Sequence, residues 1–474
     1  MTTRIDWLVL GNVMLGNFLS GVSTRTFLIG LPSVAEGLGT DILGISRAMI
    51  SFQLASISLA IVFGRLGDIY GRNGIYALGL VTTTASSFLC GMEQNVLQLI
   101  VFRFFQGVGS AMTQSAARAL AMEAMPPGSV GKAQGLMTLA FHCGFLVGPP
   151  LGGLIIDYLN WRWIFFLIVP IGAAAITLTA VRLRGQRAPR RREMRRPLDY
   201  AGAGLFVALM VTLIVLLDRR FVERIDAAQM GMLALAFAGM LLGFLVHEYR
   251  VTSPIVDLSL FRIRMFTSSI LSLLGIAIAY GLVDFLMPFY LQGVLHLTPS
   301  FIGVLFLAAP VLTIVLAPLS GHAADRIGPR LPTSLGVIAI IASSGIGALL
   351  RIDSHWLLPA AMLAMAGIGA ALFNAPNHAA VIGAVASEDR GFATGFIYTI
   401  FGLGHMLGIS TGTALLTLAF RHYSGIPGAT PHPDAPVPFT SSLNVSYLAA
   451  LLLSLAALCC SLMRGDAESS RRAR

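Results

Sequence analysis

The feature that most constrains this chain is a series of apolar runs that recurs along its whole length. Each run spans about 20 residues, which is the length an α-helix needs to cross the hydrocarbon core of a bilayer. Charged residues make up only 11% of the 474-residue chain, whereas soluble domains carry about a quarter. The sequence therefore predicts an all-α polytopic membrane protein and excludes an ordinary soluble fold.

Fourteen stretches have the length and composition of a membrane-spanning helix. They cover residues 7–32, 43–64, 74–92, 96–121, 132–156, 162–183, 199–217, 227–247, 265–292, 299–321, 332–350, 356–384, 392–420 and 443–463. The loop between the sixth and seventh stretches is strongly basic, and such loops stay in the cytoplasm. It contains Arg182, Arg184, Arg187, Arg190, Arg191, Arg192, Arg195 and Arg196. Alternation then predicts a multi-pass protein of the cell inner membrane with both termini cytoplasmic.

A short motif occurs twice, as GRLGDIYGR after the second span and as GHAADRIGPR after the tenth. Many transporters are built from repeated halves around a central site. We therefore expect residues 1–183 and 265–474 to form two pseudo-symmetric six-helix bundles. Residues 184–264 would hold the basic cytoplasmic loop and two inserted transmembrane helices.

The sequence contains no pattern typical of catalysis or cofactor binding. No nucleophile–base set, Walker-type phosphate loop or metal-ligand cluster is present, and the four cysteines lie in apolar runs. The net charge of +10 is explained by cytoplasmic loops and does not indicate a nucleic-acid partner. We expect no enzyme activity, no metal and no cofactor, in a monomer that handles small molecules within the lipid bilayer.

Several motifs resemble the major facilitator superfamily, in its fourteen-helix drug:proton antiporter branch. They are the GRLGDIYGR loop, RFFQGVGSA in the fourth span, GFLVGPPLGG in the fifth, WRWIFFLIVPIG in the sixth, and YLQGVLHLTPSFIGVLFL from the ninth into the tenth. Their order and spacing match the branch over almost the whole chain. The resemblance implies proton-coupled export of small amphiphilic or drug-like compounds by alternating access.

The resemblance also implies a cytoplasmic gate and an antiporter hinge. The gate residues would be Gly64, Asp68, Gly71 and Arg72, with Asp325 and Arg330 as counterparts in the second half. The hinge residues would be Gly144, Gly148, Pro149, Gly152 and Gly153, because small side chains let helices approach closely and proline interrupts backbone hydrogen bonds. Ile69 and Asn73 stand where the branch often has basic residues, which predicts a weaker gate.

Charged residues inside predicted spans are costly and are functional candidates by default. Arg25, Arg103 and Asp284 lie well inside such spans. We assign proton coupling to Asp284, because a buried carboxyl can be tuned by its surroundings, and to Arg103 by the resemblance. Arg25 and Asp284 lie at similar depths in pseudo-equivalent spans, so we expect them to approach each other across the central cavity.

Polar residues share helical faces with these charges and are expected to line the substrate cavity. They are Asn17, Ser20, Thr24, Arg25, Gln106, Gln114, Tyr280, Asn374, Asn377, His378 and His405. Ser23 stands where many members of the branch have an acid linked to cationic drugs. A buried arginine favours carboxylates or phosphates. Two alternatives follow: a transporter of an anionic lipid or metabolite with different coupling, or a transport-inactive sensor on the same fold.

Overall fold

The computed structural model describes residues 6–126, 130–183, 199–217, 226–251, 256–386 and 390–464. In these ranges every regular element is a helix and none is a strand. The segment 184–198, with all the arginines expected to orient the chain except Arg182, lies outside the described residues. The predicted all-α fold with many candidate spans is confirmed.

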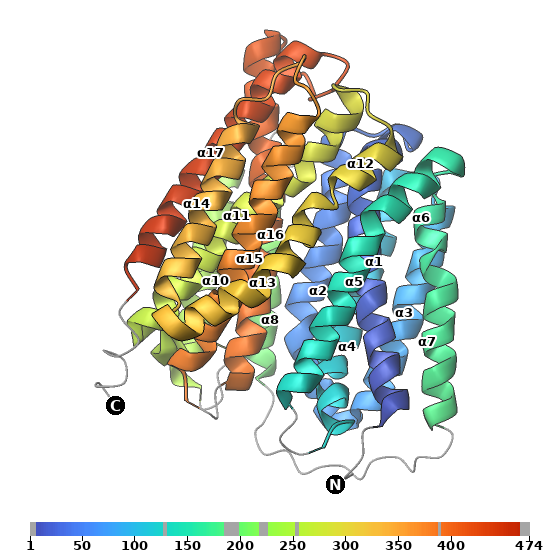
Figure 1. Cartoon of the computed structure of the whole chain (residues 1–474), viewed down its shortest axis with the longest axis vertical. Helices are drawn as coiled ribbons and strands as arrows, with labels where there is room; N and C mark the ends of the chain where they lie inside the picture. The colour runs from blue at the N-terminus through green and yellow to red at the C-terminus, as the bar shows by residue number, and fades with distance from the viewer. Residues whose placement is uncertain are drawn as a thin grey trace. The chain divides into compact units, whose positions relative to one another are not determined.

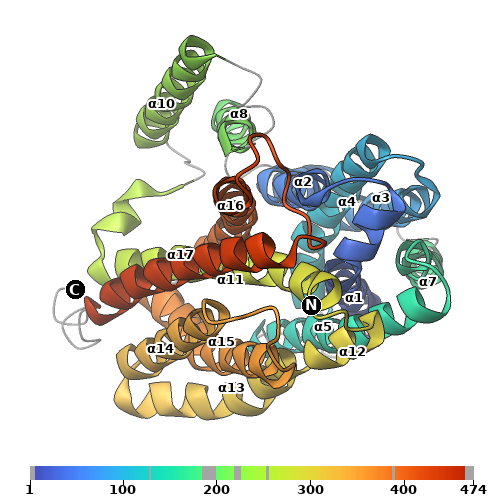
Figure 2. The same cartoon turned by 90° about the horizontal axis from the view of Figure 1, so that it is seen from above.

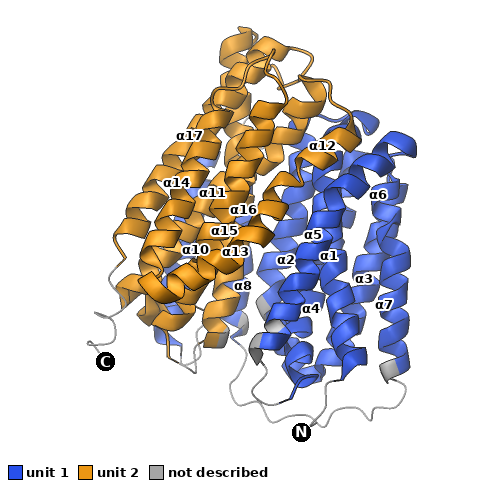
Figure 3. Ribbon diagram, in the orientation of Figure 1, with its two compact units in different colours: residues 1–255 blue, residues 256–474 orange. Residues whose placement is uncertain are grey.

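The chain divides into two compact units, residues Met1–Ile255 and Val256–Arg474 (Figure 3). Unit 1 contains α1 (Trp7–Gly37), α2 (Ile42–Tyr70), α3 (Arg72–Met92), α4 (Val96–Glu123), α5 (Val130–Tyr158), α6 (Trp163–Phe166), α7 (Ile168–Leu183), α8 (Tyr200–Leu217) and α10 (Ala227–Arg250). Unit 2 contains the short 3-10 helix η1 (Leu258–Arg262), α11 (Arg264–Gly293), α12 (Pro299–Leu305), α13 (Ala308–Ile327), α14 (Arg330–Gly347), α15 (Leu357–Ala384), α16 (Arg390–Ser424) and α17 (Pro436–Leu462). The inserted helix pair, α8 and α10, thus groups with unit 1.

Local sequence explains where several helices begin. Asp41, Asn95 and Asp226 each accept a hydrogen bond from a backbone N–H in the first turn of α2, α4 and α10, which satisfies a donor that has no partner within the helix. The two copies of the repeated motif make tight turns between α2 and α3 and between α13 and α14. Gly71 and Gly328 lie in these turns with φ of +103° and +82°, a region that favours glycine.

In unit 1, α5 packs along α1, and α4 packs against both α2 and α3 (Figure 1). A buried apolar cluster joins α1, α3, α4, α5 and α7 through residues such as Leu10, Tyr76, Leu120, Met137 and Ala175. The packing holds the α1, α4 and α5 residues singled out above in fixed register within this unit.

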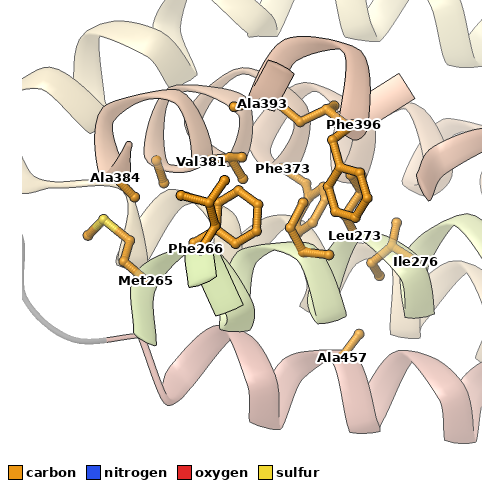
Figure 4. Packing of buried hydrophobic residues seen from close by; sticks show 14 of the residues in the cluster. Met265, Phe266, Leu273, Ile276, Phe373, Val381, Ala384, Ala393, Phe396 and Ala457 are labelled. Carbon is orange, nitrogen blue, oxygen red and sulfur yellow. The ribbon is translucent and has the colours of Figure 1, made fainter. Parts of the chain in front are cut away.

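In unit 2, α11 is the central helix and contacts α15, α16 and α17. Phe266, Leu273, Phe373 and Phe396 are fully or almost fully buried in one cluster that spans these helices (Figure 4). Burial of such side chains contributes about 1.5–3 kcal/mol each to folding in water, but in a bilayer close packing has to supply much of the stabilisation. The central position of α11 matters because it carries Asp284.

Helices α8 and α10 pack against each other (Figure 2). Most apolar residues of α10 are exposed. Such an exposed apolar surface is typical of a helix that faces lipid. Within the described residues, twelve helices are long and apolar enough to cross a membrane. Neither α1 nor α8 is among these twelve, so the count of fourteen stays a prediction.

Candidate functional site

The glycines of α5 bring it into close contact with α1. A Cβ on Gly144 would collide with the Phe18 carbonyl oxygen, and one on Gly148 would lie 2.9 Å from the Cβ of Arg25. A Cβ on Gly152 would lie 2.8 Å from Cγ2 of Thr26. These contacts require glycine, because no side chain fits between the two backbones. The stretch assigned to the antiporter hinge is therefore a helix–helix packing surface within unit 1.

This close packing places Arg25 over an aromatic ring. The Cζ atom of Arg25 lies 3.7 Å from the ring centroid of Phe145 on α5, within the range of a cation–π interaction. Arg25 also interacts electrostatically with His142, which lies on α5 one turn before Phe145. Arg25, His142 and Phe145 are all partly exposed. Arg25 belongs to unit 1 and Asp284 to unit 2, so their pairing stays a prediction.

Arg103 on α4 is buried and is held by neutral groups. Its Nη1 donates to Oε1 of Gln106 at 2.6 Å, and the Gln106 amide donates to the Ser87 hydroxyl at 2.7 Å. The guanidinium also stacks on Phe27 and Phe52, at 4.1 and 4.4 Å from the ring centroids. Its Nε has no hydrogen-bond partner among the described residues, and none of them gives it a carboxylate. A buried cation without an acid is costly, which is typical of a functional position rather than of a stabilising pair.

Asp284 meets a histidine inside unit 2. Oδ2 of Asp284 on α11 lies 3.9 Å from Nε2 of His405 on α16, and both side chains are more than four-fifths buried. Gly281, one turn before Asp284, lies directly against the backbone of His405, so the close approach of α11 and α16 creates the pair. Tyr280 donates from its hydroxyl to the carbonyl of Ala366 at 2.9 Å. Tyr447 on α17 lies within electrostatic range of Asp284.

The loop assigned to the cytoplasmic gate forms a three-residue ionic network. The Arg72 guanidinium donates to the Asp68 carboxylate at 2.8 and 3.0 Å and to the Glu123 carboxylate at 2.7 Å. Because Arg72 begins α3 and Glu123 ends α4, the network joins the ends of α2, α3 and α4. In unit 2, the side chains of Asp325 and Arg330 are exposed on either side of the Gly328 turn.

The remaining cavity candidates lie in different surroundings. Asn17, Ser20 and Thr24 on α1, Gln114 on α4, and Asn374 and His378 on α15 are partly exposed. Gln114 donates to the Ser110 hydroxyl at 2.9 Å, and the His378 ring packs near Tyr398. Asn377 is fully buried and accepts a hydrogen bond from Arg464, so its amide belongs to the interior packing of unit 2.

With this geometry established, comparison with known proteins decides the family. A family model described as Major Facilitator Superfamily matches residues 13–408 and 269–455. The chain belongs to the major facilitator superfamily. It is therefore a multi-pass membrane transporter of small molecules.

Members of the superfamily that this chain resembles carry names linked to drug and vitamin transport. The riboflavin transporter RibZ of Clostridioides difficile (strain 630) is 29% identical over 407 residues, which cover 85% of this chain and 86% of RibZ. The multidrug transporter protein MdtP of Bacillus subtilis (strain 168) is 26% identical over 412 residues, covering 85% and 74% of the two chains. The fold matches the crystal structure of a bacterial homolog of the human lysosomal transporter Spinster, with a TM-score of 0.70 and 14% identity over 99% and 98% of the two chains.

Several charged residues of this superfamily member were missed by sequence reasoning. Glu123 completes the Arg72 network. Arg464, two residues after α17, is 2% exposed and donates to Thr333 at 3.1 Å and to Asn377. Burial lowers the pKa of Arg464 to about 10. A charged residue beyond the end of an apolar run gives no sequence signal of burial, so only the fold identifies it.

Glu93 is a second buried charge that the sequence did not indicate. It follows the last residue of α3 and is 1% exposed, and neither carboxyl oxygen has a hydrogen-bond partner among the described residues. Burial raises the pKa of Glu93 to about 7, although its own backbone and the charge of Arg162 act in the opposite direction. Arg162 donates instead to the backbone carbonyl of Glu93 at 2.9 Å. This geometry favours the protonated carboxyl.

Proposed function

We propose that this protein exports small amphiphilic or drug-like compounds across the cell inner membrane in exchange for protons, by alternating access. Membership of the major facilitator superfamily and the drug-related names of its relatives support the transport class. The observation that carries proton coupling is the Asp284–His405 pair, in which two titratable groups lie 3.9 Å apart inside unit 2. Exchange requires a group that binds and releases protons in different states.

Asp284 is the proposed proton carrier, and His405 is its neighbour in that step. The pair is proposed from its geometry, since Oδ2 of Asp284 and Nε2 of His405 lie 3.9 Å apart and both side chains are largely buried. Arg103, buried without an acid in the described part of unit 1, is the second residue assigned to coupling. The Arg72 network is assigned to the gate, and the α5 glycines are assigned to the hinge.

Transport by purified protein in proteoliposomes with an imposed pH gradient tests this function. The panel should contain cationic, neutral and anionic amphiphiles. We expect gradient-driven flux in the wild type and a loss of at least about tenfold in Asp284→Asn, since removing one buried charge interaction costs more than about 1.4 kcal/mol. Asp353→Asn, on an exposed loop, is the matched control and should transport normally. A pH profile of flux that is identical in Asp284→Asn and the wild type would overturn the assignment.

The proposed pairing of Arg25 with Asp284 has its own test. If the two side chains stabilise one state of the transport cycle, then Arg25→Ala and Asp284→Asn should show coupling in a double-mutant cycle of transport rates. Purely additive losses would rule the pairing out.

A second candidate function is transport of an anionic lipid or metabolite. Arg25 and the absence of an acid at Ser23 favour it, because guanidinium groups bind carboxylates and phosphates. Export of cationic amphiphiles that is unaffected by Arg25→Gln would exclude this candidate.

A further inference from the structure

Arg25, His142 and Phe145 form one cluster on unit 1 that combines positive charge with flat aromatic surface. The guanidinium of Arg25 stacks on the Phe145 ring at 3.7 Å and acts electrostatically on His142. The Phe141 ring lies 5.6 Å from that of Phe145 and 5.8 Å from that of His142, and the His142 and Phe145 rings lie 6.3 Å apart. Three rings and one cation therefore occupy two adjacent turns of α5 and the facing turn of α1.

The cluster is fixed by the backbone rather than by flexible side chains. Gly148 lies beside the Cβ of Arg25, and Gly21 and Gly144 lie against opposing backbone atoms of α5 and α1. Close packing of this kind fixes the register of two helices. The Arg25 side chain therefore starts from a set position next to the α5 rings, which is the preorganisation that a binding site requires.

The arrangement matches a specific ligand chemistry. Stacking uses the face of the guanidinium, whereas carboxylates bind to the N–H donors along its edge, in a planar fork. A flat aromatic group attached to that carboxylate can stack on the neighbouring rings. An aliphatic anion would use the charge but gain less from the rings, and a cation would be repelled by Arg25.

We infer that the Arg25–His142–Phe145 cluster is a substrate subsite for flat aromatic compounds that carry a carboxylate. The inference rests on the proposed transport function and narrows its substrate class to aromatic anions. Arg25 binds the carboxylate, Phe145 holds the guanidinium in place and stacks on the substrate, and His142 adds a hydrogen-bonding group beside them.

Equilibrium binding to the detergent-purified protein tests the subsite without any requirement for coupling. The probes are 2-naphthoate, the uncharged 2-naphthamide and the aliphatic octanoate. The wild type should bind 2-naphthoate at least about tenfold more tightly than either of the others, the size of one charge-assisted hydrogen-bonded contact. Arg25→Gln should remove the preference for naphthoate over naphthamide, and Arg25→Lys should keep only part of it.

Separate variants test the proposed stacking of the substrate on Phe145. Phe145→Leu should weaken binding of both naphthalene probes by about threefold, the contribution of one aromatic contact, and should affect octanoate less. Arg351→Gln, on an exposed loop of unit 2, and Phe105→Leu, on an exposed face of α4, are matched controls that should bind like the wild type. If Arg25→Gln fails to fold, Arg25→Lys and Phe145→Leu decide the question.

Two results would overturn the inference: naphthamide or octanoate binding as tightly as naphthoate, or a naphthoate preference that survives Arg25→Gln. A different result would contradict the proposed transport function: naphthoate would bind with the expected preference, but an imposed pH gradient would drive no flux. The two failures are therefore distinguishable.

Discussion

Replacing Glu93 with glutamine should stabilise the protein above neutral pH and leave its stability unchanged in acid. Glu93 is 1% exposed, and burial raises its pKa from 4.5 to about 7. Below the unfolded value, the carboxyl is protonated in both the folded and unfolded states, so it contributes no pH dependence. As the pH rises from about 4.5 to about 7, the unfolded state releases its proton first, and the folded state loses stability.

The size of this loss follows from the pKa difference. A pKa difference of about 2.5 corresponds to about 3.5 kcal/mol, at about 1.4 kcal/mol for each pKa unit. We take about 2 kcal/mol as the expected effect, because relaxation of the protein around a newly formed buried charge lowers its cost. Glutamine stays neutral at every pH and has nearly the same shape as the protonated acid. Glu93→Gln should therefore keep the free energy of unfolding that the wild type loses as the pH rises above neutral.

Thermal unfolding in detergent, followed by tryptophan fluorescence, measures the effect, because Trp161 and Trp163 flank Arg162 beside the Glu93 backbone. The midpoints of wild type and Glu93→Gln should coincide at about pH 4 and differ by a few degrees at about pH 8.5. Glu36→Gln, at the exposed end of α1, is the control and should change little. A Glu93→Gln difference that is the same at both pH values would refute the account of Glu93 as a buried, proton-binding carboxyl.

Two further predictions concern the arginine networks. Arg72→Ala should slow transport about fivefold, since loss of two half-exposed ion pairs shifts the gate equilibrium by about 1 kcal/mol. Glu123→Gln should slow transport less, because the contact between Arg72 and Asp68 remains. Wild-type flux in Arg72→Ala would exclude a gating role. Arg464→Ala should lower the free energy of unfolding by about 2–3 kcal/mol in denaturant titrations, because it leaves Asn377 and Thr333 without their buried donor. Arg262→Ala, at an exposed position, is its control, and equal effects of the two substitutions would contradict the buried network.

Features that depend on local sequence were predictable, and those that depend on helix register were not. The apolar runs are long enough to predict the helices, and the repeated motif predicts a similar tight turn in each half. The structure places Gly71 and Gly328 in these turns, each with a positive φ. The Asp68–Arg72 contact spans four residues and could be read from the sequence, whereas Glu123 reaches Arg72 only because α3 packs on α4. Tertiary packing, not composition, decides which charges meet.

Tertiary packing also explains why the residues predicted to line the substrate cavity lie in different surroundings. Asp284 and His405 were each identified from charge or polarity inside an apolar run, but their 3.9 Å separation depends on Gly281 meeting the backbone of α16. Asn377 has the same kind of sequence signal as His405, yet it is fully buried and bonded to Arg464. Helical periodicity assigns a residue to a face, and only the neighbouring helix determines whether that face is a cavity wall or interior packing.

The division of charges between the units has a consequence for how protons and substrate would be coupled. The intramembrane charges singled out in unit 1 are the cations Arg25 and Arg103, and the one in unit 2 is Asp284, beside His405. If unit 1 binds an anionic substrate at Arg25 and unit 2 binds the proton at Asp284, the two ligands have separate groups and need not compete for one. Coupling would then be carried by the conformational equilibrium, which each ligand shifts by its differential affinity for the two states. Because the proposed Arg25–Asp284 pair would compete with a substrate carboxylate for the guanidinium, Asp284→Asn should bind naphthoate at least as tightly as the wild type in detergent. The same variant should lose flux driven by a pH gradient, and loss of naphthoate binding together with flux would instead place proton and substrate on one shared group.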